Sequence, residues 1–153
     1  MNEYKYLKAF EDEYAKDNIR FHDEWISDKI DESFINFAEI LGAYLVKPKG
    51  DVKHALTTSQ IRNIYEEVKR IQLGGFSNLK TSFLLLRPKL SYNIKRNSNK
   101  DKGLGLQVFG DVFYRAFDII SNEQNATKQA NDFENLCQVL EAIVAFHRGK
   151  GGN

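Results

Sequence analysis

Residues 56–72, which read LTTSQIRNIYEEVKRIQ, contain a helix start, an apolar stripe and several cations beside that stripe. Residues 57–60 fit the capping box S/T-x-x-E/Q, with Thr57 as the N-cap residue. The apolar positions recur at helical spacing, at Ile61, Ile64, Tyr65, Val68 and Ile71. Gly74-Gly75 is a typical helix end. The stretch therefore predicts an amphipathic helix with one face packed inward.

The same spacing of three and four residues recurs along the rest of the chain. It appears in residues 6–14, 30–45, 77–95, 106–121 and 133–144. In residues 106–121 the stripe is unusually wide, which indicates a helix buried on more than one side. No segment alternates as a strand would. The sequence predicts an all-α bundle of about five to six helices.

Several short stretches predict where the helices stop. Asp17-Asn18 predicts a break between two N-terminal helices, and KPKGD (47–51) ends the second of them. Pro88 lies inside the predicted helix 77–95, where we expect a kink or a restart. The polar and basic stretch 93–103 predicts a flexible loop. Glycine and cations after His147 suit the end of the last helix.

The composition is that of a soluble globular protein. At 153 residues the chain is long enough for one domain with a single core. Its one cysteine, Cys137, excludes an internal disulfide and a cysteine-rich zinc site, and its apolar surroundings predict a buried, inert thiol. There is no apolar run of membrane-spanning length and the first residues are acidic, so we expect a cytoplasmic protein without membrane contact.

The charges are unevenly distributed along the chain. Residues 1–46 contain five Lys/Arg and eleven Asp/Glu, a net charge of −6, and residues 47–153 contain seventeen and ten, a net charge of +7. This asymmetry suits a basic part that faces a polyanion, or two parts that neutralise each other within one fold. We expect a variable, acidic helical segment (1–50) packed on a core (51–153) in one domain.

Signals for an enzyme are weak. His22, His54 and His147 lie in separate segments without metal-ligand spacing, and we expect His54 and His147 to be polar surface groups. The glycines of GLGLQVFG lack the G-K-[ST] ending of a phosphate loop. The sequence therefore predicts no catalytic site, no bound metal and no cofactor.

The cations of 56–72 allow two interpretations. Arg62 and Lys69 project within about 20° of each other and flank the apolar stripe, where they could extend from the edge of the packed face towards a phosphate backbone. Glu66, however, lies four residues from both Arg62 and Arg70, which is the spacing of a salt-bridged, solvated face. Taken alone, this helix favours the second interpretation.

Two further basic clusters favour contact with nucleic acid. Between residues 87 and 102, six cations accompany a single acid, and Tyr92 lies among them. Tyr92 is placed either to stack on a base or to pack at the edge of the core, and we expect the core. The C-terminal residues 147–152 form the third basic cluster.

In this order, LTTSQIRNIYEEVKRI (56–71), LRPKLSYNIKR (86–96) and FENLCQVLEAIVAFHRGKGG (133–152) resemble the small subunit of type III-A CRISPR effector complexes, the Csm complex. The shared features are the capped helix, the segment Leu-x-Pro-Lys-hydrophobic-x-Tyr and the closing helix with its glycine-rich tail. The resemblance covers about residues 55–152. It implies a non-catalytic helical subunit, because RNA cleavage and DNA cleavage belong to other subunits of that complex.

The resemblance also implies partners and a binding surface. The partners are CRISPR RNA and target RNA, other copies of the chain, and the large and backbone subunits; a homodimer is an expected form of the isolated protein. The contacts would go to phosphate and sugar groups, without reading sequence. By motif position and local charge, the first candidates are Arg62, Lys69, Arg87, Lys89, Arg96 and Arg148. The second are Lys53, Arg70, Lys95 and Lys150.

Two other functions fit the same residues. One is a helical protein–protein adaptor, whose basic clusters only balance the acidic segment. The other is an enzyme with a dispersed site, which would require a deep pocket with converging carboxylates or histidines.

Overall fold

The computed structural model describes residues 3–152, which fold into seven α-helices joined by turns and short 3-10 segments. The helices are α1 (Lys5–Glu13), α2 (Glu24–Ser27), α3 (Glu32–Val46), α4 (Thr58–Gly74), α5 (Lys80–Asn97), α6 (Leu104–Asn122) and α7 (Ala126–Gly149). The 3-10 segments are η1 (Ala15–Asp17), η2 (Pro48–Gly50) and η3 (Val52–His54). The prediction of an all-α bundle is confirmed.

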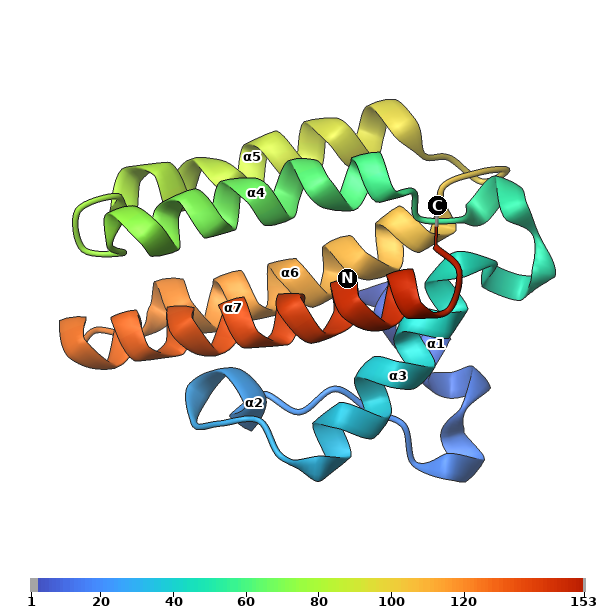
Figure 1. Cartoon of the computed structure of the whole chain (residues 1–153), viewed down its shortest axis with the longest axis horizontal. Coiled ribbons are helices and arrows are strands. Elements are labelled where there is room, and N and C mark those ends of the chain that lie inside the picture. Colours follow the sequence, from blue (N-terminus) through green and yellow to red (C-terminus); the bar gives the residue numbers. More distant parts are fainter. Residues whose placement is uncertain (1–2, 153) are drawn as a thin grey trace.

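The helices form three layers (Figure 1). The antiparallel pair α6 and α7 lies in the middle, and the hairpin of α4 and α5 covers one side of it. Helices α1, α2 and α3 cover the other side, where they pack against α6 and α7. The acidic N-terminal part and the α4–α5 hairpin are therefore on opposite sides of the central pair.

The structure has one helix more than the predicted range, the short α2. Its four residues, EWIS, are too few to show a helical repeat in the sequence. Trp25 is buried there among aromatic side chains, and its indole N–H donates to the Asp31 carboxylate at 3.0 Å. Asp31 also caps α3 by accepting from the Phe34 N–H at 3.0 Å.

Helix α4 starts and ends where the sequence predicts. The Thr57 side chain accepts from the Gln60 N–H at 3.2 Å, and the Gln60 side chain accepts from the Thr57 N–H at 2.9 Å. Gly75, with φ of 91°, ends the helix in a conformation that residues with a Cβ rarely adopt. Asn18, with φ of 57°, marks the predicted N-terminal break in the same way.

Helix α5 differs from the prediction in two respects. Pro88 lies inside one continuous helix rather than at a restart, on a part of α5 where Leu84 and Leu85 are about half exposed, so the carbonyl that loses its donor can bind water. The helix also extends to Asn97, so the prediction of a flexible loop from residue 93 is wrong. Ile94 packs against the core, and the Asn97 side chain donates to the Asn93 carbonyl at 2.9 Å.

The centre of the core is α6, as its wide stripe predicts. Buried apolar residues occur on nearly every turn of this helix, from Leu106 to Ile120. Phe83 of α5 stacks on Phe117 at 4.8 Å and meets Phe133 of α7 edge-on, so the aromatic contacts join three helices.

Helix α1 is capped by a residue of α6. The Asp111 carboxylate accepts from the backbone N–H groups of Tyr6 at 2.8 Å and Leu7 at 3.0 Å. The residue that precedes α1, Tyr4, provides no side-chain cap, so Asp111 satisfies donors at the start of a helix about a hundred positions away. Burial raises the pKa of Asp111.

Helices α3 and α7 approach each other closely at Gly42. A Cβ atom at this position would lie 2.6 Å from the Phe146 Cβ and 2.9 Å from the backbone nitrogen of His147. Because backbone atoms of α7 cannot move aside separately, this crossing requires glycine.

Candidate nucleic-acid interface

A groove runs between α4 and α5 on the outer side of the bundle. Two adjoining hollows form it, of about 210 and 400 Å³, and they share Asn63, Lys89 and Asn93. The inner hollow has an apolar floor made by Ile64, Leu86, Leu90 and Phe113. The outer hollow is lined by Asn63, Lys89, Tyr92, Asn93, Arg96 and Asn97. We call these two hollows the α4–α5 groove.

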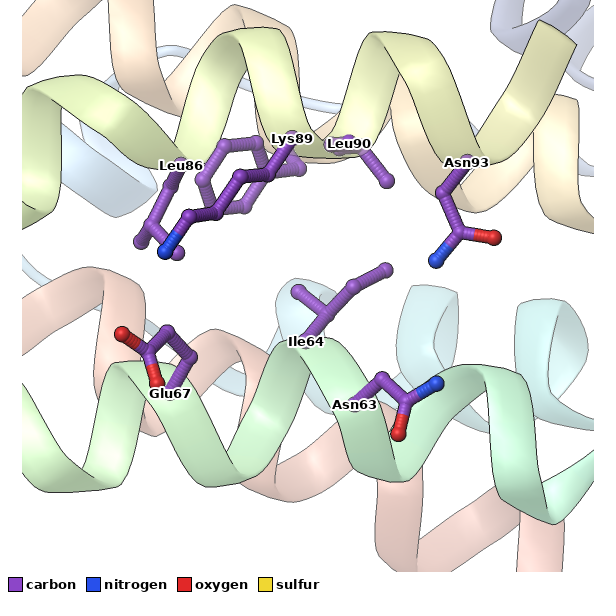
Figure 2. A pocket seen from close by; sticks show the side chains of 8 residues that line it. Asn63, Ile64, Glu67, Leu86, Lys89, Leu90 and Asn93 are labelled. Atoms are coloured by element: carbon purple, nitrogen blue, oxygen red, sulfur yellow. The ribbon is translucent and has the colours of Figure 1, made fainter. Parts of the chain in front are cut away.

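Polar side chains stand on both walls of the groove (Figure 2). Lys89 extends from α5 towards α4 on the side where Glu67 lies, and Asn93 faces across the opening towards the helix that carries Asn63. Glu67 accepts a hydrogen bond from Arg70 at 2.7 Å, and this bond lowers the pKa of Glu67. The groove thus offers a cation and two amide groups above an apolar floor.

Lys89 and Arg96 are the predicted site residues that the structure brings together in this groove. Both are exposed, and neither forms an ion pair within residues 3–152. Lys95, on the same helix, is also exposed but does not line the groove.

Arg62 and Lys69 lie on the other side of α4, towards α7. Three residues beyond Lys69, Gln72 donates to Glu134 of α7 at 2.8 Å. The Lys69 ammonium lies 6.0 Å from the centre of the Tyr65 ring and is half-buried. Arg62 approaches Glu66 at 3.9 Å, a loose and exposed pair that contributes little.

Two predicted arginines have strong partners in the fold. Arg70 pairs with Glu67 at 2.7 Å, and not with the Glu66 that the sequence spacing indicates. The Arg87 guanidinium binds Asp118 of α6 at 2.6 Å and lies 4.8 Å from the centre of the Tyr114 ring. Asp118 also accepts from the Tyr4 hydroxyl, so Arg87 helps to connect α5, α6 and the N-terminus.

The remaining candidates gather at one end of the bundle, near the C-terminus. Lys53 and Arg148 are exposed, and within residues 3–152 they form no ion pair, whereas Lys150 pairs with Glu39 of α3 at 3.1 Å. Among the predicted cations, Lys150 alone bonds a carboxylate of residues 3–46. Mutual neutralisation of the basic clusters and the acidic segment therefore accounts for little of the observed pairing.

The expectation that His54 and His147 are surface groups is wrong. His147 is 0% exposed, and its Nε2 lies 2.7 Å from the Leu56 carbonyl. His54 is half-buried and its Nδ1 accepts from the Leu104 N–H at 3.1 Å, so it caps α6. His147 falls seven residues after Leu140 on the apolar stripe, which places it on the buried face of α7.

His147 is held in its neutral form. A carbonyl only accepts, so Nε2 carries the proton, and the buried Nδ1 has no hydrogen-bond partner within residues 3–152. Burial lowers the pKa of His147, because a charged ring there would lose its hydration. Gly152 lies directly against the ring, since a Cβ at that position would approach its atoms to 2.2–2.6 Å.

We predict that the free energy of unfolding falls as the pH drops below about 6.5, the ordinary histidine value. Below that pH the unfolded chain binds a proton at His147 that the folded chain excludes. The contribution of His147 to stability is therefore fully present above that pH and is lost as the pH falls towards the lowered pKa of the folded state. Urea unfolding between pH 7.5 and 5.5 measures the slope. In His147→Gln the slope should become smaller; an equal slope in both proteins would show that His147 does not cause it.

Residues outside the groove show little reactive chemistry. Cys137 is 4% exposed, and burial raises its pKa to about 12, so the thiol is protonated at neutral pH. Residues 3–152 contain no cluster of three or more side chains that could hold a metal ion. In the same residues, no helix combines the length and apolar character needed to cross a membrane.

Five residues with polar side chains line the groove without having been predicted as site residues: Asn63, Glu67, Tyr92, Asn93 and Asn97. Tyr92 is 67% exposed, so the expectation that it packs at the core edge is wrong. Its position on α5, about 180° around the helix from Phe83, was a sufficient signal. Asn63 and Asn93 carry no charge and no motif, and only the pairing of α4 with α5 brings them together.

Comparison with family models identifies the chain's relatives. The model described as Csm2 Type III-A matches residues 28–153. The match includes all of α3, which the resemblance found in the sequence did not reach, and leaves out α1 and α2. Searches of curated proteins and of solved structures give no match.

Proposed function

The chain belongs to the Csm2 family and is a small subunit of a type III-A CRISPR complex, and from this premise we propose that it holds guide and target RNA through sugar–phosphate contacts. The α4–α5 groove and the cations around it form the contact surface. The chain acts there without catalysis, as a positioning element of the complex.

The observation that supports this proposal most is that two cations, Lys89 and Arg96, line one groove and form no ion pair within residues 3–152. The groove belongs to a basic layer, because residues 58–97 contain eight Lys/Arg and two Asp/Glu, a net charge of +6. The opposite layer, residues 1–46, has a net charge of −6. A polyanion is attracted to the first layer and repelled by the second, which orients the subunit on RNA.

The kind of contact follows from what an RNA-guided complex must do. Its guide changes, so its protein subunits must hold the RNA without reading base edges. In A-form RNA the phosphates and 2′-hydroxyls are the accessible groups. Arginine and lysine side chains suit the phosphates, and the Asn63 and Asn93 amides can bond either group.

The predicted site residues fall into three groups on this view. Lys53, Lys89, Lys95, Arg96 and Arg148 are exposed and unpaired within residues 3–152, so they are available to phosphate without breaking a contact of the fold. Arg62 and Lys69 would add contacts at the α7 side of α4. Arg70, Arg87 and Lys150 each give up a carboxylate partner if they bind RNA, so their contributions are smaller.

Protein partners have a separate place on the surface. Leu73 at the end of α4 is 84% exposed, and Leu84 and Leu85 on α5 are about half exposed. Exposed leucines of this kind suit contact with other subunits of the complex, including further copies of this chain. The proposed RNA groove lies towards the other half of the same hairpin.

The proposal is tested by the salt dependence of RNA binding, on the chain alone and in the reconstituted complex. We expect the logarithm of affinity to fall linearly with the logarithm of salt concentration. The double variant Arg62→Glu/Lys69→Glu should bind about tenfold more weakly, to the same degree for unrelated RNA sequences, since phosphate contacts do not depend on the base.

An affinity that does not respond to salt would contradict the proposal, and so would unchanged RNA binding by every charge-reversal variant. In that case the adaptor function is favoured, provided that the chain still joins the complex.

A further inference from the structure

Tyr92 has no visible role in the fold. It is 67% exposed, and its hydroxyl has no hydrogen-bond partner within residues 3–152. By contrast, the hydroxyls of Tyr4 and Tyr114 bond Asp118 and Ser91. A large aromatic ring left in water is a common feature of binding surfaces.

The surroundings of Tyr92 indicate what it binds. Lys89 and Arg96 lie three residues before and four residues after it, so all three side chains share one face of α5. The same residues line the outer hollow of the α4–α5 groove together with Asn63, Asn93 and Asn97. An aromatic ring between two cations, with the Asn63 amide on the facing helix, matches a nucleotide: a flat base and a phosphate on either side.

We propose that Tyr92 stacks on the face of an unpaired nucleobase while Lys89 and Arg96 hold the flanking phosphates. The proposal rests on the RNA contact proposed above and adds a requirement to it. In a continuous duplex both faces of each base are covered by their neighbours, so the ring can reach only a base that is single-stranded or displaced from the stack.

Stacking also fits a complex whose guide changes. Every base has an aromatic face, so a ring can bind any of the four without selecting a sequence. The apolar floor of the adjoining hollow, lined by Ile64, Leu86 and Leu90, can contact the flat face of a base or a ribose, and the Asn63 and Asn93 amides can bond the polar edge. The groove would thus distinguish unpaired from paired RNA, and not one sequence from another.

The test compares Tyr92→Ala and Tyr92→Phe in the full-length chain, alone and in the reconstituted complex. Fluorescence anisotropy measures the affinity for three labelled strands of about 20 nucleotides each: oligo(A), oligo(U) and an abasic strand. We expect Tyr92→Ala to weaken binding to both base-containing strands by about 5- to 100-fold, and Tyr92→Phe to stay close to the native affinity. The abasic strand should bind all three proteins equally.

Salt dependence separates stacking from charge. The slope of affinity against salt should be unchanged in Tyr92→Ala, because no cation is lost, and should fall in Lys89→Glu/Arg96→Glu. If the charge variant weakens RNA binding and Tyr92→Ala does not, stacking is wrong while the RNA contact stands. If native protein binds no RNA, alone or in the complex, both are wrong.

Two further results would overturn the stacking proposal. An equal loss of affinity for the abasic strand in Tyr92→Ala would assign the ring to backbone contact or to the shape of the groove. Normal RNA affinity with poor incorporation of Tyr92→Ala into the complex would show that the ring contacts a protein subunit.

Discussion

Reversal of Lys89 and Arg96 to glutamate is expected to weaken RNA binding about 100-fold at about 0.1 M salt, the largest functional effect among the variants considered. Both side chains line one groove and neither has a carboxylate partner within residues 3–152, so the fold loses no ion pair. Two phosphate contacts disappear and two repulsive charges replace them. Anisotropy titrations at several salt concentrations measure the loss and a salt slope smaller by about two.

A matched control uses Lys16→Glu/Lys29→Glu. These lysines are exposed, Lys16 in η1 and Lys29 between α2 and α3, in the acidic N-terminal part of the chain. The double reversal changes the net charge of the chain equally. We expect this control to change RNA affinity less than threefold, since the charges lie far from the groove and are screened. Equal losses in the two double variants would mean that net charge, and not the groove, determines binding.

Gly42→Ala is expected to lower the free energy of unfolding by about 2–3 kcal/mol, a large effect for the addition of a single methyl group. The new Cβ would lie 2.6 Å from the Phe146 Cβ and 2.9 Å from two backbone atoms of α7. Helix α7 packs along α3 and also carries the core contacts of α4, so a shift there disturbs more than one interface. Thermal unfolding should show a melting temperature lower by roughly 4–12 °C.

Gly149→Ala is the control for this substitution. Gly149 also lies in a helix, as the last residue of α7, but a Cβ there would meet no atom within 4 Å. Alanine favours the helix over glycine, so the melting temperature should stay the same or rise slightly. If both substitutions lower it equally, the close approach at Gly42 is not the cause.

Most of the fold could be predicted from local sequence because its helices are long and amphipathic. The capping box at Thr57, the glycines after α4 and the wide stripe of α6 each specify a local structure, and each is confirmed. The errors occurred where contacts with residues distant in the sequence determine whether a segment is helical. Ile94 stays helical because it packs against the core, and α2 forms around Trp25, which the aromatic side chains of other segments enclose.

The candidate site was less predictable than the fold. Charge density indicated the right segment of α5, but charge does not reveal which cations are already bonded. Arg87 has the motif position of a binding residue and yet lies against Asp118 and the Tyr114 ring, which come from a helix far along the sequence. Tyr92 and His147 were misplaced for a simpler reason: their positions around the helix were available and were not given enough weight against residue type.

The cap that Asp111 provides to α1 affects the order in which the protein is made. Tyr6 is separated from Asp111 by 105 positions, so the first helix has no partner for its backbone donors until the ribosome has added α6. At the usual speed of translation this takes roughly 5–20 s. During this time the aromatic residues of the N-terminal layer cannot yet pack against α6. The N-terminal layer, first to be synthesised, is therefore among the last parts of the bundle to assemble.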